Sequence, residues 1–185
     1  AAGLRSSTTG EGSAIWTTKD SPIKSVEDLK GKKVAVYSLG SSGITLVRIA
    51  LADVFGLDVS LQGGDIDFVE MPAPAMPAAL ATGKVDAATL IHLQAFKAAQ
   101  DGDFVPTVET MTALLEKSKL QMVSAVLAGY EDKLNANPEA YKEFLRMIQE
   151  SRAYALAHSD EVYTAVGKAY DVDPAFFDTW FTKFS

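Results

Sequence analysis

The sequence predicts an α/β fold in which a parallel-sheet lobe is followed by C-terminal helices. Between residues 32 and 102, short β-rich runs alternate with apolar residues at helical spacing, the pattern of a parallel sheet covered by helices. After residue 127 the pattern is helical to the end. The 185 residues are 48% hydrophobic and 22% charged, a composition typical of folded proteins, and suffice for one domain or two small lobes.

The first elements are short. Residues 1–14 are rich in Gly, Ser and Thr and are expected to form a loop. Ile15–Lys19 is predicted to be extended. Ser25 and Asp28 have the spacing of a capping box, so Val26–Lys30 is expected to form a one-turn helix that Gly31 ends.

The alternating region predicts three strands and three helices. A glycine follows each helix, which is where a helix commonly ends. The predicted strands are residues 33–39, 67–71 and 86–91, and the predicted helices are residues 44–55, 75–82 and 93–100.

The last third is predicted to hold one strand and then three helices. The strand is Leu120–Leu127. Asn137 is a natural N-cap with Pro138 at the first helical position, and Ser159 and Asp173–Pro174 are expected to begin the next two helices. The three helices carry apolar faces, and the aromatic face of the last is more typical of a core than of a ligand site. These faces are Tyr141, Phe144, Leu145 and Ile148; Val162, Val166 and Tyr170; and Phe177, Trp180, Phe181 and Phe184.

Composition excludes several classes of function. The formal net charge of −7, without a basic cluster, disfavours nucleic acid as a partner. The absence of cysteine removes disulfides, thiolate metal ligands and cysteine nucleophiles. Two distant histidines and no metal-type spacing predict no metal and no cofactor, and give catalysis little support. The sequence contains no signal peptide and no apolar run of membrane-spanning length.

The loop Gly40–Gly43, between the first strand of the alternating region and its helix, is the first candidate site. Unpaired N–H groups and partial positive charge at a helix start, beside the hydroxyls of Ser41 and Ser42 and the backbone of Gly43, suit a small anion such as a sulfonate or carboxylate. Alternatively, Ser41 or Ser42 only caps the helix. The loop lacks the lysine of a phosphate-binding loop and the third glycine of a dinucleotide fingerprint, so neither ATP nor NAD is supported.

A second loop, residues 89–94, follows the third predicted strand. Because carboxyl ends of parallel strands meet at one edge, Thr89, His92 and Gln94 are expected to face the same cleft as Ser42. His92 either donates a hydrogen bond to a ligand or is an exposed histidine without a role. His158 is expected to end a helix and to interact with its dipole.

Three segments resemble a known family. Residues 21–36 (SPIKSVEDLKGKKVAV) are similar to the start of the second lobe in periplasmic solute-binding proteins of ABC transporters, in the nitrate/sulfonate/taurine-type (NMT1/THI5-like) branch. Residues 76–87 resemble the helix–strand step of this family, and Asn137–Ala140 resembles the opening of its C-terminal helices. The order and spacing agree over roughly residues 15 to 185.

The resemblance implies a type II periplasmic binding fold, with two lobes joined by hinge strands around a ligand. Residues 1–19 would be a lead-in and first hinge strand, 20–110 a complete lobe, and 111–185 the return hinge strand and helices that would pack on a first lobe not found here. It also implies capture of a small anionic or polar solute, delivery to a permease, and a periplasmic or extracellular location. The resemblance also strengthens the assignment of Ser41, Ser42 and Gly43 as ligand-binding residues.

Three other possibilities stay open. A sensor or regulatory domain would use the same lobes to read a metabolite. A pyrimidine-synthase-like enzyme shares the fold but depends on cysteines that this chain lacks. Finally, the C-terminal helices, if exposed, would favour self-association or a partner fragment.

Overall fold

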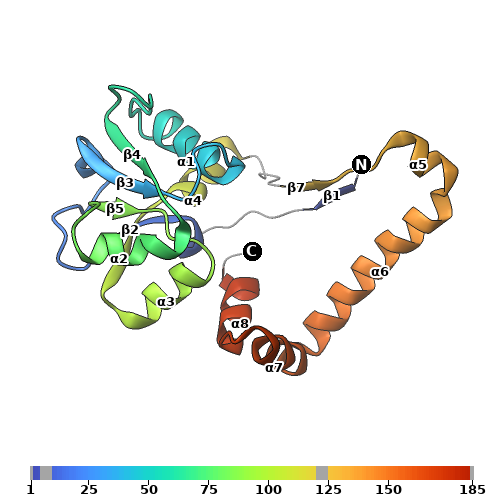
Figure 1. Cartoon of the computed structure of the whole chain (residues 1–185). Coiled ribbons are helices and arrows are strands. Elements are labelled where there is room, and N and C mark those ends of the chain that lie inside the picture. Colours follow the sequence, from blue (N-terminus) through green and yellow to red (C-terminus); the bar gives the residue numbers. More distant parts are fainter. Residues whose placement is uncertain (1, 5–9, 120–124, 184–185) are drawn as a thin grey trace.

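The computed structural model describes residues 2–4, 10–119 and 125–183, and consists of an α/β body and a set of C-terminal helices (Figure 1). A five-stranded sheet forms the centre of the body, in the order β4-β3-β5-β2-β6. Strand β3 is parallel to both β4 and β5, whereas β2 is antiparallel to β5 and β6. The strands are β2 (Ala14–Thr18), β3 (Lys32–Val36), β4 (Ile66–Glu70), β5 (Ala87–Ala88) and β6 (Phe104–Glu109).

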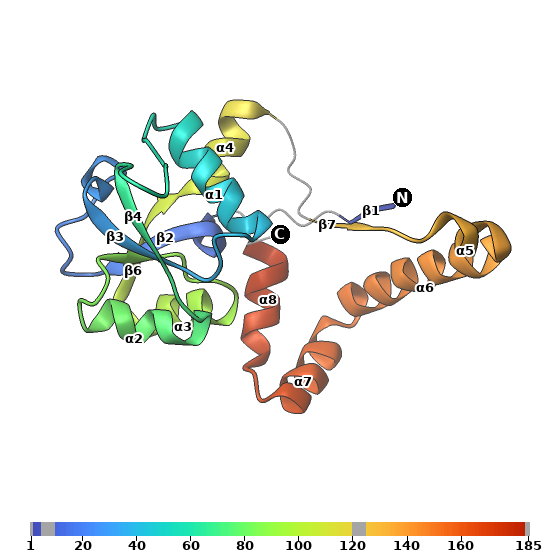
Figure 2. The same cartoon turned by 45° about the horizontal axis from the view of Figure 1, so that its top comes forward.

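Alternation along the strands divides the core between the two faces of the sheet. Trp16, Ala35 and Ala88 pack on one face of the sheet. The residue that precedes each of them in the sequence packs on the other face. The first face is covered by α2 (Met76–Ala81) and α3 (Leu93–Asp101), and the second by α1 (Ser42–Asp53). Helix α4 (Thr110–Ser118) packs on α1 through Met111 and Leu114 (Figure 2).

The predicted elements of the alternating region are present with small shifts in their bounds. All three helices are confirmed. The first two predicted strands are also confirmed, as β3 and β4, and their bounds differ from the predicted ones by at most three residues. The third predicted strand is reduced to the two residues of β5. The predicted one-turn helix is the 3-10 turn η2 (Glu27–Leu29), and the Asp28 carboxylate accepts hydrogen bonds from the Ser25 N–H and hydroxyl.

The sheet differs from the prediction in two ways: it has an additional edge strand, and some of its strands are antiparallel. The strand β6 and the helix α4 were not predicted, and β2 and β6 make the sheet mixed. Strand β2 contains most of the segment predicted as the first hinge strand, and it lies inside the sheet between β5 and β6. The expectation of a loop over residues 1–14 is wrong at residues 2–4, because β1 (Ala2–Leu4) pairs antiparallel with β7 (Ala125–Leu127). Residues 120–124 of the predicted strand lie outside the described residues.

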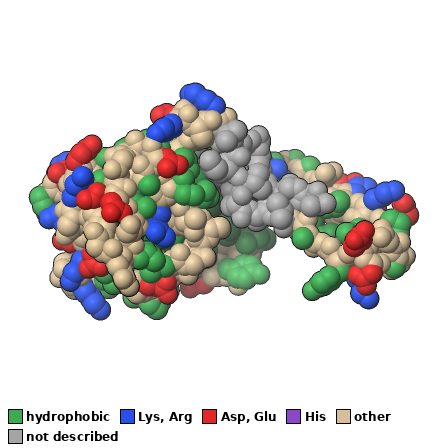
Figure 3. Space-filling view, turned by 90° about the horizontal axis from the view of Figure 1, so that it is seen from above, with side chains coloured by type: hydrophobic (Ala, Val, Ile, Leu, Met, Phe, Trp, Pro, Cys, Tyr) green, Lys and Arg blue, Asp and Glu red, His purple; other side chains and the backbone are tan. Residues whose placement is uncertain are grey.

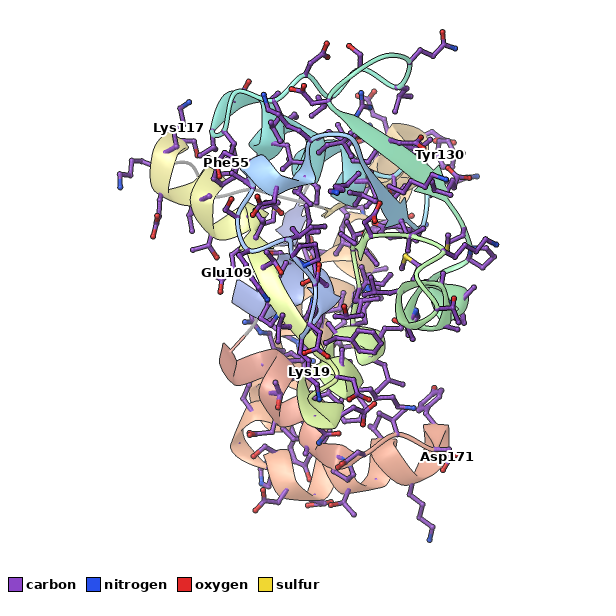
Figure 4. All side chains as sticks on the ribbon, turned by 90° about the vertical axis from the view of Figure 1, so that its left-hand side faces the viewer. Lys19, Phe55, Glu109, Lys117, Tyr130 and Asp171 are labelled. Carbon is purple, nitrogen blue, oxygen red and sulfur yellow. The ribbon has the colours of Figure 1, made fainter. Side chains whose placement is uncertain are left out.

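The helices after β7 extend from the body and return to it (Figure 1). Helix α6 (Pro138–Ala157) has no buried residue, and of the apolar side predicted from its sequence Phe144 is exposed while Tyr141, Leu145 and Ile148 are partly buried. Helix α8 packs against α7 and against α3 of the body. Figure 4 shows these helices below the body, with Asp171 between α7 and α8. The bounds are η1 (Gly10–Ser13), η3 (Ala73–Ala75), α5 (Glu131–Ala136), α6 (Pro138–Ala157), α7 (Ser159–Tyr170) and α8 (Pro174–Lys183).

The predicted helix starts are correct to within one residue, but their capping differs. Pro138 is the first residue of α6, and the Asn137 side chain makes no capping hydrogen bond. Ser159 is the first residue of α7 and not its N-cap, which is His158. His158 ends α6 as predicted, and its Nδ1 lies 3.0 Å from the Tyr154 carbonyl oxygen. In the part of the chain that the structure describes, no helix has both the length and the apolar character needed to cross a membrane.

Candidate functional site

The candidate site lies at the carboxyl edge of the parallel strands. Val36 pairs with Glu70 across β3 and β4, and Ala35 pairs with Ala88 across β3 and β5. The segments that follow these three strands therefore leave the sheet at one edge. In open α/β sheets this is the edge at which ligands bind.

Ser41 caps α1, as the simpler interpretation of this loop predicts. Its hydroxyl accepts a hydrogen bond from the Ile44 N–H at 3.2 Å and donates one to the Ser38 carbonyl at 3.0 Å. These two bonds use the hydroxyl proton and one lone pair. Ser41 therefore holds the loop in place, and its side chain has little capacity left for a ligand.

Ser42 and Gly43 offer free polar groups in the first turn of α1. Ser42 is exposed, and no described residue bonds to its hydroxyl. The N–H groups of both residues donate to no acceptor within the described ranges, as expected at a helix start. These N–H groups and the Ser42 hydroxyl form a set of donors in a region of partial positive charge.

Tyr37 is a neighbour of this turn that the sequence interpretation missed. A methyl group added at Gly43 would lie 2.5 Å from the Tyr37 hydroxyl oxygen, so the phenol lies directly over the turn. The Tyr37 ring packs against the core on the α2–α3 face. The available signal was its position, because Tyr37 lies in the predicted strand only three residues before the glycine–serine loop.

Glu70 fixes the other side of the loop and brings a negative charge to this edge. Its carboxylate accepts a hydrogen bond from the Leu39 N–H at 2.7 Å. Glu70 is exposed at the end of β4. An anion bound at Ser42 would therefore depend on neutral donors and would have a carboxylate in its vicinity.

The structure places the three residues of the second loop in different surroundings. Thr89 is 4% exposed, and its N–H and hydroxyl both donate to the Ala35 carbonyl, at 2.9 and 3.2 Å, so its hydroxyl is used within the sheet. Gln94 lines a surface pocket of about 290 Å³ between η3, α2, α3 and Phe104, whose lining does not include Ser42 or His92. The expectation that Thr89 and Gln94 face the same cleft as Ser42 is not supported by these positions.

His92 stays at the edge of the sheet. It precedes α3 with a φ of 48° and a ψ of −121°, and its ring lies 4.8 Å from the ring of Trp180 in α8. Partial burial lowers the pKa of His92 below its ordinary value, which favours the neutral imidazole at pH 7. A neutral imidazole has one donor and one acceptor nitrogen, so it can bind a polar ligand without an ionic contact.

The described residues contain no group of three or more histidine, cysteine or acidic side chains suited to a metal ion. Among the described residues, this edge carries hydroxyl, imidazole and backbone N–H groups as donors. It also carries the Glu70 carboxylate, which is an acceptor. This set is chemically suited to a small polar or anionic molecule.

Comparisons with known proteins agree with this architecture. The family model described as NMT1/THI5 like matches residues 6–162. A binding protein of Brucella abortus (strain 2308) and one of Brucella suis biovar 1 are each 25% identical over 167 residues, which cover 85% of this chain and 46% of each relative. The chain thus spans about half the length of these curated relatives.

Solved structures share the fold. The periplasmic aliphatic sulphonate binding protein SsuA from Escherichia coli has a TM-score of 0.77 and 21% identity, over 96% of this chain and 56% of its own. The alkanesulfonate-binding protein SsuA from Xanthomonas axonopodis pv. citri has a TM-score of 0.64 and 20% identity, over 96% of this chain and 56% of its own. The α/β fold is thus that of periplasmic binding proteins.

Proposed function

Because the chain belongs to the NMT1/THI5-like family, we propose that it is part of a periplasmic solute-binding protein that supplies an ABC transporter. The solute would be a small anion or polar molecule, such as a sulfonate, nitrate or carboxylate. The sulfonate-binding proteins of the same fold support this choice of class. The role requires reversible binding and release to a membrane permease, and involves no catalytic step.

The observation that carries this proposal is the first turn of α1. The exposed Ser42 hydroxyl and the unpaired N–H groups of Ser42 and Gly43 lie together at the carboxyl edge of the sheet. Backbone donors of this kind fit the oxygen atoms of a sulfonate or carboxylate. His92, at the end of a neighbouring strand, would be a second contact.

The domain division follows from the same proposal. The α/β body would be one lobe, formed by residues 20–110 together with β2 inside the sheet and α4 packed on α1, and the β1–β7 pair would belong to a hinge. The residues before β2 would lead into this lobe, and the residues after α4 would return through the hinge to the C-terminal helices. This arrangement would allow the two lobes to close around a solute by a hinge motion.

Amide NMR titration of the ¹⁵N-labelled chain with ethanesulfonate tests the proposed site, and it detects even millimolar binding. We expect the largest shifts at the amides of Ser42 and Gly43. Ethylammonium chloride at the same ionic strength is the control for a solute of opposite charge. The absence of a saturable shift at these two amides would contradict the proposed site.

The variant Glu70→Gln then tests the charge of the solute. Glutamine keeps an acceptor for the Leu39 N–H and removes the negative charge. Ethanesulfonate should bind Glu70→Gln more tightly than wild type, because the repulsion is gone. Tighter binding of ethylammonium to wild type than of ethanesulfonate would instead identify a cationic solute.

A further inference from the structure

His92 adopts a backbone conformation that its surroundings must maintain. Its φ of 48° and ψ of −121° lie in a region that residues with a side chain seldom occupy. The turn leads from β5 into α3, where the His92 carbonyl accepts the first helical hydrogen bond, from the Phe96 N–H at 3.1 Å. The His92 side chain makes no capping hydrogen bond, so its ring is available for other contacts.

Aromatic rings from α8 meet His92 and Phe96. Phe176 and Trp180 are four residues apart in α8 and so lie on one side of that helix, while His92 directly precedes α3 and Phe96 lies in its first turn. The centroid of the His92 ring lies 4.8 Å from that of Trp180, and the Phe96 ring lies 5.6 Å from Phe176 in an edge-to-face arrangement. Phe176 and Trp180 also contact each other at 5.8 Å. Figure 1 shows α8 beside the body at α3.

An adjacent side of α8 packs against α7. Tyr163, which is 8% exposed, contacts the rings of Phe177 and Phe181, each at a centroid distance of 5.9 Å. The turn between the helices is tight, because the Val172 N–H donates to the Gly167 carbonyl at 2.9 Å. Helix α8 thus packs between α3 and α7. These contacts hold Trp180 beside His92.

We propose that Trp180 is a positioning residue for His92, so that α8 sets the geometry of the solute-binding edge. The four rings of His92, Phe96, Phe176 and Trp180 form a contact between the C-terminal helices and the loop after β5. The effect on the solute rests on the proposed function, in which His92 contacts the solute. The contact between the two rings, however, can be measured without any solute.

The two histidines of the chain make this contact measurable by NMR. His92 and His158 are the only histidines, so a ¹³C-histidine-labelled chain gives two Cε1–Hε1 signals, which the variant His158→Gln assigns. Burial of the ring lowers the pKa of His92. His158 stacks on Tyr154 of α6 and serves as an internal reference.

Three variants of α8 separate positioning from general damage to the helix. Trp180→Leu removes the ring, and the pKa of His92 should then rise toward 6.5. Trp180→Phe keeps a ring and should restore the wild-type value. Phe181→Leu, which removes a ring that contacts Tyr163, should leave His92 unchanged. Far-ultraviolet circular dichroism confirms that each variant is folded.

Ethanesulfonate, followed by the shift of the His92 signal, completes the test. Trp180→Leu should bind it roughly three- to tenfold more weakly than wild type, and Trp180→Phe should bind it like wild type. An unchanged pKa of His92 in folded Trp180→Leu would overturn the positioning role. If the pKa responds as expected but ethanesulfonate does not shift His92 in wild type, the contact is established and the proposed role of His92 in solute binding is wrong.

Discussion

At the residue scale, Ser41 and Ser42 are neighbours with different tasks. The Ser41 hydroxyl is engaged by the loop and the helix, whereas the Ser42 hydroxyl is exposed at the first turn. We therefore expect Ser42→Leu to abolish ethanesulfonate binding, because the isobutyl group covers the N–H donors. Its free energy of unfolding should stay within about 0.5 kcal/mol of wild type, since the position is exposed.

The control for Ser42→Leu is Thr45→Val in the same turn. The Thr45 hydroxyl donates to the Ser41 carbonyl at 2.9 Å and is exposed. This variant changes a polar side chain of α1 without covering the N–H groups of Ser42 and Gly43. Titration calorimetry and urea unfolding compare the two variants. Ethanesulfonate binding that survives in Ser42→Leu would contradict the anion site.

Gly43 and Tyr37 are coupled by close approach. In Gly43→Ala the new methyl group would lie 2.5 Å from the Tyr37 hydroxyl oxygen but 3.7 Å from the ring carbon that carries it. Alanine in a helix is favoured over glycine by about 0.5–1 kcal/mol. We expect Tyr37 to reduce or cancel this gain and Tyr37→Phe to restore it. A double-mutant cycle on urea unfolding measures the coupling, and independent effects would contradict the contact.

At the element scale, the turn η2 is held by a carboxylate. Asp28 accepts hydrogen bonds from the N–H groups of Lys24 and Ser25 and from the Ser25 hydroxyl, which lower its pKa from the ordinary 3.8. A carboxyl whose pKa is lower in the folded chain stabilises the fold above its unfolded pKa and loses this effect as the pH falls through the folded value.

The stability difference between wild type and Asp28→Ala should therefore depend on pH. We expect Asp28→Ala to lower the urea midpoint at pH 7 and the difference to shrink as the pH falls below 3.8. Glu27→Ala is the control for loss of a carboxylate from the same turn. A difference between wild type and Asp28→Ala that is constant from pH 7 to pH 2.5 would exclude the charged hydrogen bonds as its cause.

The elements that could be predicted from the sequence are those whose signals are local. The helices that end at Gly83 and Gly102 carry both an apolar face and a stop signal, and both are present. Strand β6 was missed because Pro106 interrupts it, and proline is tolerated there at the edge of the sheet. Strand β1 is three residues long and depends on β7, more than 120 positions away in the sequence.

In the candidate site, too, local contacts could be predicted from the sequence and long-range contacts could not. The cap at Ser41 is a contact over three residues, and a cap at Ser41 or Ser42 was the alternative interpretation of the loop. Thr89 was expected to face a cleft, but pairing of β5 with β3 directs its hydroxyl to the Ala35 carbonyl, 54 positions away. The contact between His92 and Trp180 joins residues that no local pattern connects. Local sequence thus predicted the first turn of α1, while the second loop depended on tertiary contacts.

At the scale of the whole molecule, neighbouring rings partly cover the aromatic side of α8, whereas α6 exposes part of its apolar surface. The aromatic face of α8 was expected to be core, and Phe177 and Trp180 are partly buried against neighbouring rings, although Phe181 is 43% exposed. Helix α6 instead exposes Phe144 and Leu156, each 52% exposed. Figure 3 shows side chains of both charges spread over the visible face.

The exposed side of α6 predicts self-association of this chain. Soluble monomers seldom leave a large apolar surface uncovered, and α6 has 20 residues, none of which is buried. In native mass spectrometry we expect a multiple of 19.8 kDa. Phe144→Lys should shift the distribution toward the monomer, because a charge in an apolar contact is costly.

The matched control for this variant is Glu143→Lys, on the adjacent polar side. Glu143 pairs with Arg146, which lowers the pKa of its carboxyl, so this change breaks an ion pair but leaves the apolar side intact. It should not change the mass distribution. A monomer of 19.8 kDa in wild type would show that copies of this chain do not cover α6. The apolar side of α6 would then be free to pack against another polypeptide, as it would in a two-lobed binding protein.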